Sequence, residues 1–300
     1  MTDIGELVSI AIDAPHKEEG CPFCRPKEEV NSKNCLRADF DEDTKADNDT
    51  DNSSGVLAKN LAQRPRSRIE ILPGESAPIH DMELPEAKTR HWRDWVYEAG
   101  LSPVLFGAHH TIPGNDGLGK SNLYKKGWLG PVDDGPDAAN IGYNINSANN
   151  GVWLPGNYAI RGAEHRPSQT TWSEEDKEFQ KAYAFLAMVE TKRQFHDAHK
   201  NYSKTIKDAL NELEELMEDM AQDGCPMCGK GDEEVDPPYH LNSRLNAISN
   251  FLSRRLQGNP LKWKDDYLTS DNWGPAFVKE ARKHANFGDL KAAVLALANK

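Results

Sequence analysis

The chain has 300 residues, of which 37% are hydrophobic and 28% are charged, and its formal net charge is −12. This composition is typical of a polar globular protein with room for one large domain or two moderate ones. The chain has no run of eighteen apolar residues and no secretory leader pattern at its N-terminus, and its acidity argues against a protein that coats nucleic acid, so we expect none of these classes.

The negative charge is unevenly distributed along the chain. Residues 1–60 carry seven basic and fourteen acidic side chains, whereas residues 101–170 carry five of each. A local basic surface in the second stretch is therefore compatible with the net negative charge of the chain. Its candidate members are Lys120, Lys125, Lys126, Arg161 and Arg166.

Two matching cysteine pairs lie near opposite ends of the chain. They are Cys21-Pro-Phe-Cys24, which follows a short predicted helix, and Cys225-Pro-Met-Cys228. A Cys-x-x-Cys pair lets two thiolates reach one ion, and two such pairs complete a tetrahedral zinc shell. We therefore predict a structural Zn²⁺ site that joins the N-terminal segment to the C-terminal third.

Other interpretations of these cysteines stay open. The four thiols could form disulfides in an exported protein, or they could belong to two separate redox motifs. Cys35 is left over, and Cys35 and His240 are alternative zinc ligands if one pair is not used.

The next hundred residues give weaker signals. Residues 38–54 are almost all Asp, Asn, Thr, Glu and Ser, which predicts a solvated loop or a disordered linker. We expect residues 55–90, with their prolines, arginines and short apolar runs, to wrap a neighbouring surface. Residues 92–99 predict a short helix before Gly100.

Residues 103–167 are rich in Gly, Pro and Asn, which predicts a region dominated by loops. Short extended segments are expected at residues 104–106 and 152–154. Chemistry is often carried on loops of this kind because a surrounding scaffold can position them.

Helical patterns dominate after residue 173. A start resembling a capping box at Ser173-Glu-Glu-Asp176 precedes Phe179, Tyr183, Leu186 and Val189 at helical spacing. A second helix is predicted over residues 201–220, with one apolar stripe and one acidic face that we expect to be solvated. The stripe consists of Ile206, Leu210, Leu213, Leu216 and Met217, and the acidic face of Glu212, Glu214, Glu215, Glu218 and Asp219. Two more helices are expected over residues 241–256 and after Asp289, joined by a tryptophan-rich connection.

His109 and His110 stand side by side at the end of the first extended segment. Adjacent residues of a strand point to opposite faces. One imidazole can therefore bind a divalent ion while the other accepts a proton from water. A purely structural role for both histidines is the alternative.

Two later segments supply possible partners. Asn150 precedes Gly151, a pair that often marks only a turn, but its amide could also hydrogen-bond the backbone near the histidines. His196 and His199 are three residues apart, a spacing that would place both on one face of a helix. The simpler interpretation of the second pair is a solvated helix start.

Taken in order, these segments resemble a known family. Ala108-His-His-x-Ile-Pro113, then Asn150-Gly-Val-Trp-Leu-Pro155, then His196-x-x-His-x-x-Tyr202 are similar to the AHH nucleases of the HNH/endonuclease VII (His-Me finger) superfamily. The resemblance covers roughly residues 100–215. Such domains are typical of bacterial polymorphic toxins, including effectors of contact-dependent and type VI secretion systems.

The resemblance implies a role for each matching residue. His110 would be the general base that activates water, His109 would lie at the metal position, and Asn150 would orient the loop that carries the base. His196 or His199 would be the helix-borne ligand of one Mg²⁺ or another divalent cation. In this chain about forty residues, including a predicted helix, separate Pro155 from His196, a longer link than we expect in the family.

We therefore expect an α+β protein, mostly helical, with a ββα-metal nuclease core, added helices and the structural zinc site. The expected divisions are residues 1–90 with the first cysteine pair, 91–222 as the nuclease domain, and 223–300 with the second pair.

The expected function is that of a metal-dependent DNA endonuclease, an antibacterial toxin secreted without a signal peptide into a target-cell cytoplasm. Its partners would be DNA or RNA, a cognate immunity protein and a secretion carrier, with no membrane. The alternatives are a zinc-stapled adaptor with an inactive nuclease-like loop, and a metal-dependent hydrolase of another class.

Overall fold

A computed structural model describes part of the chain. The described residues are 5–9, 51–63, 79–83, 101–126, 129, 143–156, 174–223 and 241–298. They divide into two compact units. The first unit comprises the described residues within Met1–Ser53, His110–Asn150 and Ser203–Leu252, and the second comprises those within Ser54–His109, Gly151–Tyr202 and Ser253–Lys300.

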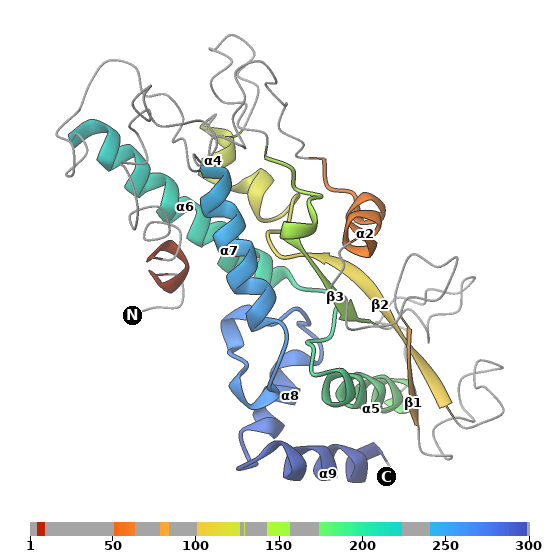
Figure 1. The fold of residues 1–300 in the computed structure, drawn as a ribbon. Coiled ribbons are helices and arrows are strands. Elements are labelled where there is room, and N and C mark those ends of the chain that lie inside the picture. Colours follow the sequence, from red (N-terminus) through yellow and green to blue (C-terminus); the bar gives the residue numbers. More distant parts are fainter. Residues whose placement is uncertain are drawn as a thin grey trace, which may run out of the picture. The chain divides into compact units, whose positions relative to one another are not determined.

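The second unit contains a small sheet in the order β1-β2-β3 (Figure 1). β1 (Ile79–Glu83) pairs antiparallel with β2 (Leu101–His110), so that Ile79 lies opposite Leu105. At the edge of β3 (Gly151–Pro155), the Gly156 N–H donates to the Leu105 carbonyl at 3.1 Å. Every side chain of β3 is buried. The sheet is therefore covered where β3 lies.

α5 (Glu174–Thr191) is the central helix of the second unit. Its residues Ala184 to Val189 are buried without interruption, as expected for a helix covered on all sides. α5 contacts β1 and β3 on one side and α9 (Phe287–Ala298) on another. The Phe185 ring packs edge-on against Phe277 of α8 (Gly274–Ala281), with centroids 5.2 Å apart.

A shorter helix, α2 (Ser54–Ala62), covers the start of β3. Leu57 and Leu61, one turn apart, are its buried residues. A Cβ atom at Gly151 would lie 2.7 Å from the Leu57 side chain and 3.0 Å from Leu61. Glycine at this position therefore lets the helix approach the strand closely.

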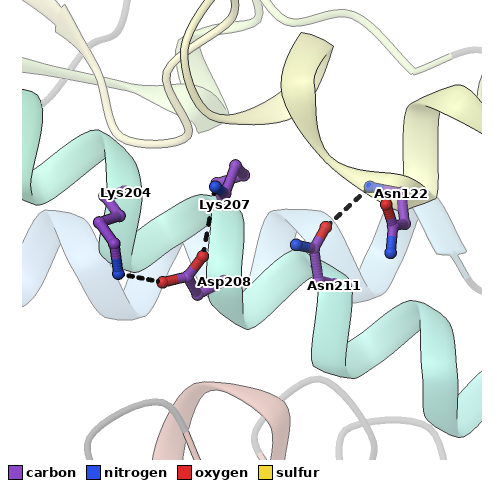
Figure 2. A network of polar contacts seen from close by, with 5 residues as sticks. All are labelled: Asn122, Lys204, Lys207, Asp208 and Asn211. Carbon is purple, nitrogen blue, oxygen red and sulfur yellow. Dashed lines mark hydrogen bonds and ion pairs between the residues drawn. The ribbon is translucent and has the colours of Figure 1, made fainter.

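The first unit is built on α6 (Lys200–Asp223) and α7 (Leu241–Arg255), each of which also has an end in the second unit. Buried residues recur at helical spacing on both helices, at Ile206, Leu210 and Leu213 of α6 and Leu245, Ile248 and Leu252 of α7. The short helix α4 (Asn122–Lys125) is fastened to α6, because the Asn122 N–H donates to Asn211 Oδ1 at 2.7 Å (Figure 2).

Short 3₁₀ segments complete the described structure. They are η2 (Leu118–Lys120) and η4 (Ala148–Asn150) in the first unit, and η7 (Pro260–Lys262) and η8 (Asp265–Tyr267) in the second. Within the described part of the chain, no helix has the length and apolarity needed to cross a membrane.

The mostly helical architecture and its small antiparallel sheet agree with the expected α+β class. The extended segments at 104–106 and 152–154 and the helices starting near residues 173, 201 and 241 are confirmed. α2, β1 and α8 were not expected. The helix predicted over residues 92–99 lies outside the described residues, and so does nearly all of the acidic stretch 38–54.

Two expectations for α6 are wrong. Glu214, expected on a solvated face, is 0% exposed, and its Oε2 lies 3.1 Å from Lys126 Nζ. Leu216, expected on the buried stripe, is 37% exposed. Helical spacing gives the face of a residue, but the neighbouring segment that covers this face decides its burial.

Candidate functional site

Three imidazole rings converge within the second unit. His109 is near the end of β2, and its ring centroid lies 4.7 Å from that of His196 and 5.0 Å from that of His199. The rings of His196 and His199 stack at 5.3 Å. One nitrogen from each ring can be chosen so that all three lie within 4.8 Å of one another.

This group fits a divalent metal ion. Imidazole nitrogens bind zinc at about 2.0–2.1 Å, which places two ligands of a tetrahedral ion about 3.3 Å apart. The three nitrogens lie within 4.8 Å of one another, so they would have to move closer together to bind one ion. His109 is buried, whereas His196 and His199 are half-buried, so the group is accessible from their side.

The loop before α6 presents two of these histidines and is held by backbone hydrogen bonds. The His196 N–H donates to the Pro155 carbonyl at 2.7 Å, at the end of β3. The Asp197 N–H donates to the Thr269 backbone carbonyl at 3.2 Å, and the Asp271 N–H donates to the Ala198 carbonyl at 2.6 Å. The loop is thereby attached both to the sheet and to the segment 269–271.

Side chains reinforce the same loop. Arg193 donates through Nη1 to the Trp153 carbonyl at 2.7 Å, and its guanidinium lies 6.0 Å from the Phe106 ring centroid. Burial lowers the pKa of Arg193 to about 10, so it remains a cation at neutral pH. Asp271 Oδ2 accepts the Lys200 N–H at 2.7 Å, which satisfies a donor at the start of α6.

Tyr202, in the first turn of α6, lies against the histidine group. Its ring centroid is 5.4 Å from that of His109 and 6.0 Å from that of His199. The side chain is 0% exposed. Burial, with a smaller contribution from Tyr267, raises the pKa of Tyr202 well above its ordinary value, so its hydroxyl stays protonated.

His110 belongs to the first unit and has a different environment. Its Nε2 lies 3.0 Å from Asn146 Oδ1, and its side chain is only 8% exposed. Burial lowers the pKa of His110 below 6.5, and the hydrogen bond with Asn146, which raises it, does not compensate. The imidazole is therefore neutral at neutral pH and can accept a proton.

Asn150 holds the backbone that follows His110. Its Oδ1 accepts from the Ile112 N–H at 2.8 Å, from Thr111 Oγ1 at 2.9 Å and from Ser249 Oγ at 2.9 Å. Its Nδ2 donates to the carbonyls of Ile112 at 3.1 Å and Ile145 at 2.9 Å. The side chain is 1% exposed. These contacts fix the turn that leaves β2.

The structure thus brings together His109, His196 and His199 in one unit and His110 and Asn150 in the other. One detail differs from expectation, because His196 and His199 precede α6 and do not lie on it. The loop contacts, and not helical spacing, bring them together.

Other residues singled out in the sequence lie outside the described part of the chain. They are Cys21, Cys24, Cys35, Cys225, Cys228, Arg161, Arg166 and His240. The structural zinc site therefore stays a prediction.

Sequence reasoning missed Asn146 and Asp271. Asn146 stands in a stretch with asparagines at 144, 146, 149 and 150, and this density was the available signal. Asp271 gave no signal, because its partners at 198, 200 and 201 lie about seventy residues away.

A comparison with family models gives a match over part of the chain. Residues 102–224 match AHH, described as a nuclease family of the HNH/ENDO VII superfamily with conserved AHH. Ala108, His109 and His110 form that triplet, and the match includes Asn150, His196 and His199. No curated protein and no solved structure matches the chain. Over residues 102–224, this chain is therefore similar to the AHH nuclease family.

Proposed function

We propose that the chain is a metal-dependent endonuclease that hydrolyses phosphodiester bonds, with His110 as general base and one divalent ion held by His109, His196 and His199. The observation that carries this proposal is the convergence of three imidazoles from two segments of the AHH match. His110 follows His109 directly, so their Cα atoms are about 3.8 Å apart.

The reaction proposed for His110 is proton transfer from water. The lone pair of the neutral imidazole takes the proton while the water oxygen forms a bond to phosphorus and the bond to the 3′-oxygen breaks. Burial keeps His110 neutral, which supports this role. A divalent ion at the three imidazoles would stabilise negative charge on a phosphate oxygen and on the leaving 3′-oxygen.

The donor set favours one class of ion within the expected divalent cations. Imidazole nitrogens suit Zn²⁺, Ni²⁺ and similar ions, whereas Mg²⁺ prefers carboxylate, carbonyl and water oxygens. With three histidines in the group, we propose that Zn²⁺ or Ni²⁺ binds more tightly than Mg²⁺.

A plasmid nicking assay tests this proposal through the metal. The protein is treated with EDTA, and Zn²⁺, Ni²⁺ or Mg²⁺ is then added back to wild type and to His199→Ala. We expect EDTA to abolish nicking, Zn²⁺ or Ni²⁺ to restore it at lower concentration than Mg²⁺, and His199→Ala to need far more ion. Full nicking in EDTA would refute the metal dependence.

The proposed biological role is that of an antibacterial toxin delivered into the cytoplasm of a target cell, with a cognate immunity protein and a secretion carrier. Its support is the family match, which describes a nuclease, together with the sequence resemblance to toxin domains. DNA is the proposed substrate, and a parallel assay with RNA tests the alternative. Expression in a bacterial cytoplasm should arrest growth for wild type and not for His110→Ala.

The structural zinc site is a separate proposal. Its support is the spacing of the pairs Cys21–Cys24 and Cys225–Cys228. Metal analysis of purified Cys225→Ala should show one equivalent of zinc less than wild type, and unchanged zinc content would refute it.

A further inference from the structure

We infer that Asn146, held by the backbone of residues 51–53, is a positioning residue that fixes the tautomer of His110 and leaves Nδ1 as the nitrogen that accepts the proton. We call residues 51–53 the strap. This inference rests on the proposed function of His110 as general base. All the groups involved belong to the first unit.

Two backbone groups of the strap determine which way the Asn146 amide faces. The Ser53 N–H donates to Oδ1 at 3.0 Å, and Nδ2 donates to the Asp51 carbonyl at 2.7 Å. A backbone N–H can only donate and a carbonyl can only accept. If the amide were rotated by about 180°, Nδ2 would face the Ser53 N–H, donor against donor, and Oδ1 would face the Asp51 carbonyl, acceptor against acceptor. These two hydrogen-bond partners therefore fix the orientation of the amide.

The orientation of the amide decides the protonation of the ring. His110 Nε2 lies 3.0 Å from the same Oδ1. Because a carbonyl oxygen only accepts, Nε2 must carry the hydrogen. In the neutral imidazole the other nitrogen, Nδ1, then holds the lone pair. Asn146 thereby selects the nitrogen that can act on water.

The strap is packed closely enough to hold this arrangement. A Cβ atom at Gly114 would lie 2.7 Å from Asn52 Cβ, so the strap and the turn after His110 are in near contact. Asn146 is 2% exposed, and its own N–H donates to Asn144 Oδ1 at 2.7 Å. The end of the acidic stretch 38–54 therefore contributes backbone groups to the site, while Asp51 and Asn52 are exposed, as expected.

Asn146 and Asn150 have different roles, although they are only four residues apart. Asn150 binds the backbone and the hydroxyl of the turn that follows His110. Asn146 contacts the ring itself. Loss of Asn150 should therefore loosen the turn, whereas loss of Asn146 should change the tautomer within an intact turn.

The test is nitrogen NMR of the histidine rings in the full-length, metal-free protein at about pH 8, above the ordinary histidine pKa. A His110→Gln spectrum identifies the His110 signals among the ten histidines. We expect wild type to show Nε2–H and an unprotonated Nδ1. We expect Asn146→Ala to show a mixture of tautomers, and Asn146→Asp, which keeps the acceptor oxygen, to retain Nε2–H.

Kinetics give a second readout. Asn146→Ala should lower kcat for nicking by about 10- to 100-fold with little change in KM, as for other residues that orient an active group. Asn149→Ala, the same substitution at an exposed position in the same turn, should leave both constants unchanged.

Three results would overturn the inference: a wild-type ring protonated at Nδ1, a His110 spectrum unaltered by Asn146→Ala, or wild-type kcat in that variant. If wild type does not nick DNA at all, the proposed function fails, while the wild-type ring spectrum still decides the tautomer. If Asn146→Ala does not fold, the wild-type spectrum still decides the tautomer, because a ring protonated at Nδ1 would contradict the assignment.

Discussion

Replacing Asn150 by alanine removes five hydrogen bonds from one buried side chain. The amide accepts from the Ile112 N–H and from the hydroxyls of Thr111 and Ser249, and it donates to the carbonyls of Ile112 and Ile145. Alanine can make none of these contacts. Ile112 and Ile145 are 0% exposed, so water reaches their backbone groups only if the turn opens.

The expected loss of stability follows from these contacts. A buried hydrogen bond contributes about 0.5–1.5 kcal/mol net, and a buried group left without a partner costs about 1–3 kcal/mol. The two hydroxyls can rotate toward other acceptors, but the three backbone groups cannot move independently. We therefore expect the free energy of unfolding to fall by about 3–5 kcal/mol, a large part of the stability of an ordinary domain.

Urea denaturation followed by circular dichroism measures this change, with Asn149→Ala as the matched control. Asn149 is exposed, so its replacement should change the free energy of unfolding by no more than about 0.5 kcal/mol. If Asn150→Ala were within about 1 kcal/mol of wild type, the five contacts would not hold the turn, and the reasoning would be refuted.

Three further predictions follow from the site and its support. His199→Ala should weaken zinc binding by at least about 100-fold in competition with a chromophoric chelator, because one of three ligands is lost, and unchanged affinity would exclude it as a ligand. Burial holds the pKa of His110 below 6.5, so His110 stays neutral down to that pH. We therefore expect kcat/KM for nicking to stay constant as the pH falls to 6.5 and to decline only at lower pH, where His110 becomes protonated. A decline centred above pH 6.5 would contradict a neutral His110 as the base. Gly151→Val should lower the free energy of unfolding, measured by thermal denaturation, by about 1–3 kcal/mol, because the valine side chain would clash with Leu57 and Leu61. An unchanged melting temperature would show that α2 can move away from β3 without loss of stability.

The helices that the sequence predicted are those whose own residues carry the pattern. α6 and α7 place buried leucines and isoleucines at helical spacing, and β2 contains the apolar run at residues 104–106. α2 has two buried leucines and follows an acidic stretch, so its pattern is too short to recognise. β1 is defined by its pairing with β2, and no local pattern can report the pairing partner.

The residues of the candidate site likewise fall into those that the sequence predicted and those that it did not. His109, His110, Asn150, His196 and His199 were visible as motifs because the residue types themselves carry the chemistry. Their supports were not visible. The loop with His196 depends on residues 269–271, and Asn146 depends on the backbone at residues 51 and 53, more than ninety residues earlier. Contacts across such separations are properties of the fold.

The most direct test of the account is plasmid nicking by His110→Ala, beside wild type and His284→Ala, in saturating Zn²⁺. His284 pairs with Glu280 at 3.2 Å and has no place in the proposed site, so its variant controls for removing a histidine. The account predicts that wild type and His284→Ala nick DNA equally and that His110→Ala loses about 100-fold or more of the rate, the contribution of a general base. Wild-type nicking by His110→Ala would contradict it.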